Sequence, residues 1–162
     1  MISVLLVSTD QHTFAFRRED VQVVTLLPAL ETRPGDIALV EGWLRLADSS
    51  LPVLSLASVL GSPLESPQLS DHLVVTTAGG RIAWRVRRVL GLDEVGWEGL
   101  AMVEHSAEPT PCYVASFERE QETVFLLNVS GLMLVEERER LREAAERKQS
   151  RLEAISGGDR DV

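Results

Sequence analysis

The stretch that decides the fold runs from residue 39 to residue 61 and reads LVEGWLRLADSSLPVLSLASVLG. In its first half the apolar Leu44 and Leu46 alternate with other side chains, which is the period of a strand with two different faces. Residues 48–50 (Asp-Ser-Ser) are turn formers, because their short side chains hydrogen-bond nearby backbone groups. Residues 51–56 then form a second apolar strand. The stretch therefore predicts a β-hairpin.

Two residues of this stretch set local limits on the second strand. Pro52 has no backbone N–H, so we expect it at the start of that strand or on an edge. Gly61 follows Val59 and Leu60 and is expected to close a short helical turn. The stretch contains no nucleophile, metal ligand or phosphate cradle.

Further short strands lie on both sides of this hairpin. Ala78-Gly79-Gly80 is expected to be a hairpin turn, because glycine adopts a positive φ at little cost. Regularly spaced short strands are typical of small barrels or a sandwich. The segment 62–71 (SPLESPQLSD) has little core material and is predicted to cross between two halves of the chain. The other expected strands are Ile2–Ser8, Thr13–Phe16, Val21–Leu27, Leu73–Thr77, Arg81–Leu90, Tyr113–Phe117 and Thr123–Leu127.

The expected strand Arg81–Leu90 has two different faces. Trp84 and its apolar i±2 neighbours share one face, and Arg85 and Arg87 share the other. Together with Arg81 and Arg88 these two arginines form a basic patch, interpreted as a solvated strand face.

The C-terminal part of the chain is predicted to be helical from Leu132 to Ile155, because Glu and Arg often stand three or four residues apart there. A thin apolar stripe leaves two interpretations open: a solvated helix with one edge on the barrels, or a weak coiled coil. We divide the chain into a domain over 1–135, a charged helix over 136–155 and a disordered tail over 156–162.

Composition excludes several functional classes. The formal net charge is −9 over 162 residues, whereas a nucleic-acid binder needs basic charge to neutralise phosphates. No apolar run approaches the length of a membrane span, and the N-terminus lacks a signal peptide. Cys112 is the only cysteine, which indicates a reducing compartment. We expect a soluble, cytoplasmic protein with no direct membrane insertion.

Few residues are candidates for chemistry, and none forms a catalytic or metal-binding pattern. The three histidines lie far apart in predicted loops, whereas a metal site needs ligands at local spacing. Cys112 has no basic neighbour to lower its pKa, so an inert thiol is the better interpretation. Trp43 and Trp84 are expected in the core. Trp97 is expected to be exposed, which would make it an interface candidate. We expect no cofactor, and a small enzyme is the least favoured of the functions considered.

In its order of short patterns the chain resembles the CheW family of chemotaxis coupling proteins. Val21-Gln22-Val23-Val24 resembles the family's Val-Gln-Glu-Ile, and Gly42 lies ten residues before Pro52-Val53-Leu54-Ser55-Leu56, which resembles its Pro-Val-Ile-Asp-Leu strand. Residues 79–91 resemble the family's glycine turn and its Val-Asp-x-Val strand. Residues 113–133 resemble the family's closing hairpin. The resemblance implies a mainly β fold of two SH3-like five-stranded barrels around a shared core.

The resemblance also implies a function and a set of partners. It implies a non-enzymatic adaptor that couples the cytoplasmic tip of a chemoreceptor to the regulatory domain of a CheA-type histidine kinase, with other CheW-like proteins as further partners. Such an adaptor would be cytoplasmic and associated with receptor arrays through its partners. The partner-binding positions carried over from the family are Val21, Val23, Val24, Gly42, Arg45, Ala47, Pro52, Leu54 and Arg87.

Four charged family positions are changed in this chain. The family's glutamate falls on Val23, its arginine on Ala47, and two aspartates on Ser55 and Arg87. Arg45 would share a strand face with residue 47 and partly replace the lost arginine. Val23 marks a candidate hydrophobic patch, and Arg87 would repel a basic partner or recruit an acidic one. These changes leave a second hypothesis open, an accessory protein that binds only the receptor or only the kinase as a spacer or competitor.

Overall fold

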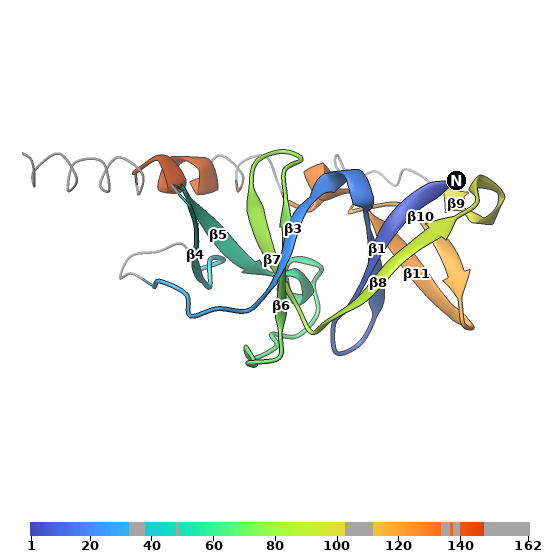
Figure 1. Cartoon of the computed structure of the whole chain (residues 1–162), viewed down its shortest axis with the longest axis horizontal. Coiled ribbons are helices and arrows are strands. Elements are labelled where there is room, and N and C mark those ends of the chain that lie inside the picture. The colour runs from blue at the N-terminus through green and yellow to red at the C-terminus, as the bar shows by residue number, and fades with distance from the viewer. Residues whose placement is uncertain (33–37, 48, 103–111, 134–136, 138–139, 148–162) are drawn as a thin grey trace, which may run out of the picture.

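The structure, a computed structural model, describes residues 1–32, 38–47, 49–102, 112–133, 137 and 140–147. Two curled β-sheets make up most of it (Figure 1), one with six strands and one with five. The mainly β class predicted from the sequence is confirmed. One sheet has six strands where five were expected, because the two residues Ala101–Met102 add a short strand at its edge.

The six-stranded sheet combines the two ends of the chain in the order β8-β1-β2-β11-β10-β9. Neighbouring strands are antiparallel, except that β11 runs parallel to β2. The predicted first and last hairpins are confirmed as β1–β2 and β10–β11. The strands are β1 (Ile2–Ser8), β2 (Thr13–Arg17), β8 (Arg88–Val95), β9 (Ala101–Met102), β10 (Tyr113–Arg119) and β11 (Glu122–Leu127).

The five-stranded sheet is formed by the middle of the chain in the order β3-β6-β7-β5-β4. The hairpin predicted from residues 39–61 is its β4–β5 pair. The turn at Gly79 and Gly80 joins β6 to β7, and both glycines have positive φ as expected. The strands are β3 (Val21–Leu26), β4 (Gly42–Leu46), β5 (Ser49–Ser55), β6 (His72–Thr76) and β7 (Ile82–Val86).

Both sheets are covered by apolar side chains on each face. In β1, Leu5 and Val7 pack into a core shared with the five-stranded sheet, whereas Val4 and Leu6 pack into a second core within the six-stranded sheet. A strand that is buried on both faces reads as a continuous apolar run, which explains the sequence ISVLLVS. The shared core also holds Trp43 and Trp84, whose predicted burial is confirmed.

Short helical turns follow several of the strands. The 3-10 turn η1 (Arg18–Asp20) leads from β2 into β3, and η2 (Trp97–Gly99) leads from β8 into β9. The short helix α1 (Leu56–Val59) follows β5 and ends before Gly61, as predicted. A third turn, η3 (Val129–Gly131), follows β11.

Two predictions about connectivity were wrong. Residues 81–90 do not form one return strand, because β7 ends at Val86 and β8 begins at Arg88 in the other sheet, where it continues to Val95. Segment 62–71 joins α1 to β6 within the five-stranded sheet, so it is not a crossing between the two sheets. The chain crosses instead at η1 and at Arg87.

Pro52 lies in the interior of β5, opposite Trp43 of β4, and not at the start of the strand. The parallel pairing of β5 with β7 begins only at Val53. Pro52 therefore lies one residue before the hydrogen-bonded pairing with β7, so its missing backbone N–H leaves that pairing intact.

The described part of the C-terminal segment is helical at residues 137 and 140–147. Leu141 is buried in the shared core, and Ala144 and Ala145 pack against it. One edge of this helix therefore lies on the β-sheets, as the first interpretation predicted. Residues 148–162, which include the rest of the predicted helix and the predicted tail, lie outside the described residues.

Candidate protein-interaction surface

Strand β3 offers partly exposed apolar side chains at one edge of the five-stranded sheet. Val21 and Val24 are half-buried and pack against the shared core. Val23 is 39% exposed and Leu26 is 61% exposed. A register shift between Val21 and Val23 turns Val23 outward, because it interrupts the regular alternation of the strand against β6. Val23 is thus exposed on the surface, as the predicted patch requires, whereas Leu26, three residues further along the regularly paired strand, lies on the opposite face.

The family-mapped positions in the β4–β5 hairpin divide into surface and core. Arg45 is exposed, and its guanidinium lies 3.9 Å from the Glu31 carboxylate. Ala47 is exposed with φ +46° in the turn after β4. Because β4 ends at Leu46, the strand rule that would have placed Arg45 and Ala47 on one face does not extend to Ala47.

The other three positions in this hairpin lie inside the fold. Pro52 and Leu54 are buried. Gly42 is buried too, and a Cβ atom there would lie 2.7 Å from the Leu30 Cβ. These three residues are therefore packed within the hairpin and are not part of the exposed surface.

The predicted basic strand face is wrong at its two central residues. Arg85 is only 2% exposed, because its side chain extends into a cluster of carboxylates. Its Nε and Nη2 donate hydrogen bonds of 2.7 Å each to the two oxygens of Glu41, and its Nη1 donates one of 2.9 Å to the fully buried Asp71. Burial alone would lower the pKa of Arg85, but its contacts with Glu41 and Asp71 outweigh burial and raise it.

Arg87 is held by the same cluster. It donates hydrogen bonds to Asp10 at 2.9 Å and to both oxygens of Asp71 at 2.9 and 3.0 Å, and it lies 3.6 Å from Glu65. The hydrogen bond to Asp10 is the main reason that its pKa is raised, so it remains a cation at any ordinary pH.

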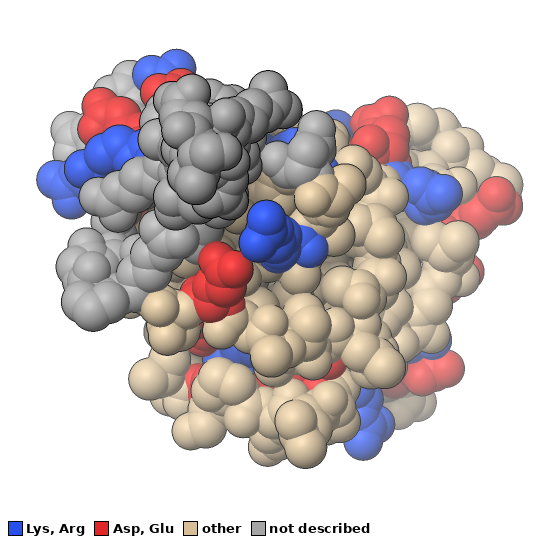
Figure 2. Space-filling model, turned by 60° about the vertical axis from the view of Figure 1, so that its left-hand side comes forward, with Lys and Arg blue, Asp and Glu red and all other residues tan. Residues whose placement is uncertain are grey.

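This cluster connects the two sheets. Asp10 belongs to the β1–β2 turn, Glu65 and Asp71 to the segment before β6, and Arg87 to the crossing from β7 to β8. The backbone N–H of Asp10 also donates to Glu65 at 2.7 Å. The arginine at position 87 is thus paired with carboxylates of its own chain. On the face shown in Figure 2, charged side chains are scattered among uncharged ones.

Several exposed apolar residues were missed by the sequence analysis. The missed residues are Leu90 and Leu92 on β8 and Met102 on β9, which are all exposed. Trp97 in η2 is exposed too, which confirms its prediction. Alternation along β8 would have indicated Leu90 and Leu92, but the expected strand was ended at Leu90, whereas β8 continues to Val95.

The histidines and Cys112 were the candidates for chemistry in the sequence. Within them, no group of three or more His, Cys, Asp and Glu side chains is placed to hold a metal ion. His12 is exposed and His72 half-buried, Cys112 is a half-buried thiol, and His105 lies outside the described residues. No helix in the described parts of the chain is both long and apolar enough to cross a membrane.

A family model described as the CheW-like domain matches residues 3–137. The chain belongs to the CheW family. The chain is 27% identical over 89 residues to the chemotaxis protein CheW of Thermotoga maritima, a match that covers 55% of this chain and 59% of that relative.

A solved structure of CheW shows the same fold. The scaffolding protein TtCheW from Thermoanaerobacter tengcongensis superposes with a TM-score of 0.71 at 13% identity, over 83% of this chain and 93% of that one. The family resemblance read from the ordered series of short patterns is thereby confirmed.

Proposed function

We propose that this CheW-family protein is a non-enzymatic adaptor in a bacterial chemosensory pathway. It couples the cytoplasmic tip of a chemoreceptor to the regulatory domain of a CheA-type histidine kinase, and it acts in the cytoplasm at receptor arrays. The observation that carries this proposal is the CheW-like domain match across residues 3–137. The fold of two sheets, which is shared with a solved CheW scaffolding protein, supports it.

The structure explains two of the four changed charges as internal adaptations. Ser55 is the N-cap of α1, where its hydroxyl oxygen accepts a hydrogen bond of 3.3 Å from the Ser58 backbone N–H. Serine and aspartate cap helices about equally well, so Ser55 keeps the role that the family aspartate would have there. Arg87 is satisfied by Asp10 and Asp71. Ser55 is buried and the Arg87 side chain is only 11% exposed, which supports an internal role for both residues.

The other two changes, at Val23 and Ala47, do alter the exposed surface. An acid is replaced by an apolar side chain at Val23, and a base is lost at Ala47. These changes favour a second candidate function, an accessory protein that binds only one of the two partners.

Calorimetric titration separates the two candidates. The purified protein is titrated with a CheA regulatory domain from the same organism, and separately with a receptor-tip fragment. Saturable binding of both supports the adaptor, and binding of one alone supports the accessory protein. If neither binds, both candidates are wrong.

The variant Ala47→Arg tests the role of the lost base. If the accessory hypothesis is correct, Ala47→Arg strengthens binding to the missing or weaker partner, and an unchanged affinity counts against it. Gln121→Arg is the matched control, because Gln121 is also exposed with positive φ (+66°) in a hairpin turn, but of the other sheet.

A further inference from the structure

An apolar cavity opens at one end of the six-stranded sheet, and its volume is about 620 Å³. Its lining includes Ala115 and Leu126, which are buried in the core of that sheet. Leu100 and Val114 also line it and pack against the same core. The cavity therefore leads from solvent to the interior of the six-stranded sheet.

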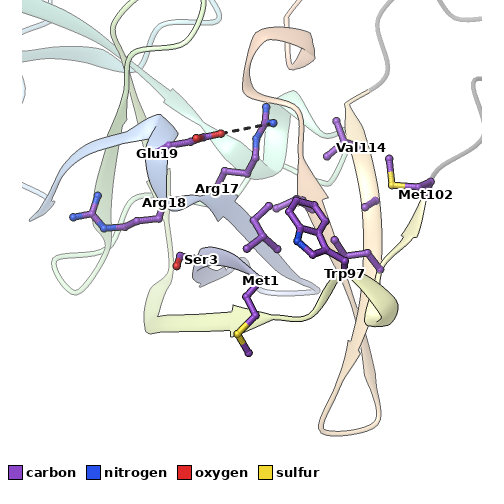
Figure 3. A pocket seen from close by; sticks show the side chains of 12 residues that line it. Met1, Ser3, Arg17, Arg18, Glu19, Trp97, Met102 and Val114 are labelled. Carbon is purple, nitrogen blue, oxygen red and sulfur yellow. Dashed lines mark ion pairs between the residues drawn. The ribbon is translucent and has the colours of Figure 1, made fainter.

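Two of the three methionines of the chain lie at this opening. Met1 and Met102 line the cavity and are 77% and 73% exposed, whereas Met133 is 3% exposed and packs in the shared core. Trp97, which is 65% exposed, lines the same opening. Figure 3 shows Met1 and Met102 on opposite sides of Trp97. Both exposed methionines of the chain are thus gathered around one exposed tryptophan.

The charged side chains that line the cavity come from one short segment and do not make this part of the opening polar. Arg17 pairs with Asp20 at 3.3 Å and lies 3.9 Å from Glu19, so its charge is balanced by its own chain. The Arg18 side chain extends away from Trp97 (Figure 3). The surface beside Trp97 is therefore uncharged, and its apolar character depends in large part on the two thioethers.

These thioethers are open to oxidation. The susceptibility of a methionine to peroxides follows its exposure. The sulfur lone pair attacks one peroxide oxygen and forms an S–O bond, the O–O bond breaks, and the other oxygen takes up the proton and leaves as water. The sulfur is oxidised and the peroxide is reduced by the same electron pair. The product is a polar sulfoxide, and a methionine sulfoxide reductase restores the thioether.

Oxidation at this opening does not require the protein to unfold. Met102 belongs to the short edge strand β9 (Ala101–Met102), which is held by backbone pairing of Met102 with Ala115 and of Ala101 with Ser116. Its side chain projects mostly into solvent, so an added oxygen there displaces no core contact. Met133 is the opposite case, because a peroxide reaches its buried sulfur only when the shared core opens.

We propose that this opening is a redox-sensitive surface, on which a peroxide oxidises Met102 and Met1 in the folded chain and the two sulfoxides turn an apolar opening into a polar one. The opening belongs to the six-stranded sheet, whereas β3 and the β4–β5 hairpin belong to the other. The proposal therefore stands or falls independently of the coupling function proposed above.

The first test measures oxidation at each methionine. The full chain is treated with hydrogen peroxide, and peptide mass spectrometry follows each methionine over time and separates the sulfoxides from oxidation at Cys112. We expect Met1 and Met102 to react at least about tenfold faster than Met133, which is the internal reference. Since the reacting side chains are exposed, the Tm of the oxidised protein should stay within about 2 °C of the untreated value.

The second test measures the surface itself. The tryptophan indoles are labelled with ¹⁵N, and the Trp97 signal is assigned with Trp97→Phe. Oxidation should shift the Trp97 signal, leave that of the buried Trp84 in place and shorten retention on a phenyl column. Treatment with a methionine sulfoxide reductase should reverse the shift and the loss of retention.

Two variants assign these effects to Met102. Met102→Leu keeps an apolar side chain of similar volume that a peroxide does not oxidise, so it should reduce both the Trp97 shift and the loss of retention. Leu69→Met is the matched control, because it places a new thioether at a 95% exposed position outside the cavity. Its additional sulfoxide should leave the Trp97 signal where it lies in the oxidised parent protein.

Four results would overturn the proposal. One is that Met133 reacts as fast as Met102. The second is that the Trp97 signal and the column retention of the oxidised protein are unchanged. The third is that both change as much in Met102→Leu as in the parent protein. The fourth is that oxidation unfolds the chain, since the sulfoxides would then act on the core and not on the surface.

Discussion

Replacing Arg87 tests whether the carboxylate cluster holds the two sheets together. In Arg87→Ala, Asp71 keeps its hydrogen bonds from Arg85 at 2.9 Å and from the Gln68 backbone N–H at 3.0 Å. Asp71 and the buried Glu65 nevertheless lose a cation that lies within 4 Å of each.

The expected loss of stability follows from these contacts. Removing one partner of a buried ion pair costs about 3–5 kcal/mol when the other is left alone. Because Asp71 remains bonded to Arg85, and because Asp10 is half exposed, we expect Arg87→Ala to cost about 2–4 kcal/mol. For a domain of this size that lowers Tm by about 5–15 °C.

Two further variants sharpen this prediction. Arg87→Asp restores the family aspartate but places a further carboxylate beside Asp10, Glu65 and Asp71, so we expect a greater loss of stability than in Arg87→Ala. Arg88→Ala is the control, because Arg88 is exposed and makes no ion pair with a described residue; its effect should stay within about 0.5 kcal/mol.

The assay is urea and thermal unfolding followed by circular dichroism and by tryptophan fluorescence. The reasoning is refuted if Arg87→Ala unfolds at the same midpoint as Arg88→Ala. It is also refuted if Arg87→Asp is as stable as the unchanged protein.

Three smaller predictions concern the packing of single residues. Gly42→Ala should cost about 1–3 kcal/mol in urea unfolding, because the new Cβ would lie 2.7 Å from the Leu30 Cβ. Thr76→Val should cost about 1–3 kcal/mol in the same assay, because it leaves the buried Trp84 indole N–H, now 2.9 Å from the Thr76 hydroxyl, without an acceptor. Burial raises the pKa of Tyr113 in the folded state, so the unfolded state releases the phenol proton first; stability should fall as pH rises above about 10, and Tyr113→Phe should make that fall shallower.

Local patterns were sufficient to predict most of the hairpins. The β4–β5 and β6–β7 pairs depend on turn residues and apolar alternation within about 15 residues, and the glycines at 79 and 80 have the positive φ that the turn requires. The burial of Trp43 and Trp84 was also predicted from the sequence, whereas the core shared by the two sheets was implied by the family resemblance. The hairpins and the burial of the two tryptophans depend on neighbours close in sequence.

The environment of Arg85 and Arg87 could not be predicted in this way. Their partners at positions 10, 41, 65 and 71 are 14 to 77 residues away, so the alternation of β7 gave only the direction of the side chains and not what they meet. Alternation alone therefore suggested solvent where the fold supplies carboxylates.

The cavity beside Trp97 was missed for a similar reason. It combines residues near positions 1, 18, 100 and 114, and only the position of Trp97 between Gly96 and Glu98 gave a signal in the sequence.

The central claim is that this protein couples a receptor to a kinase, and a reconstituted phosphorylation assay tests it most directly. The autophosphorylation rate of a CheA-type kinase from the same organism is measured with a receptor signalling fragment, with and without this protein. The adaptor account predicts a change in rate that requires all three components and that saturates with this protein. A kinase rate that is the same with and without this protein, while the receptor fragment is present, would contradict it.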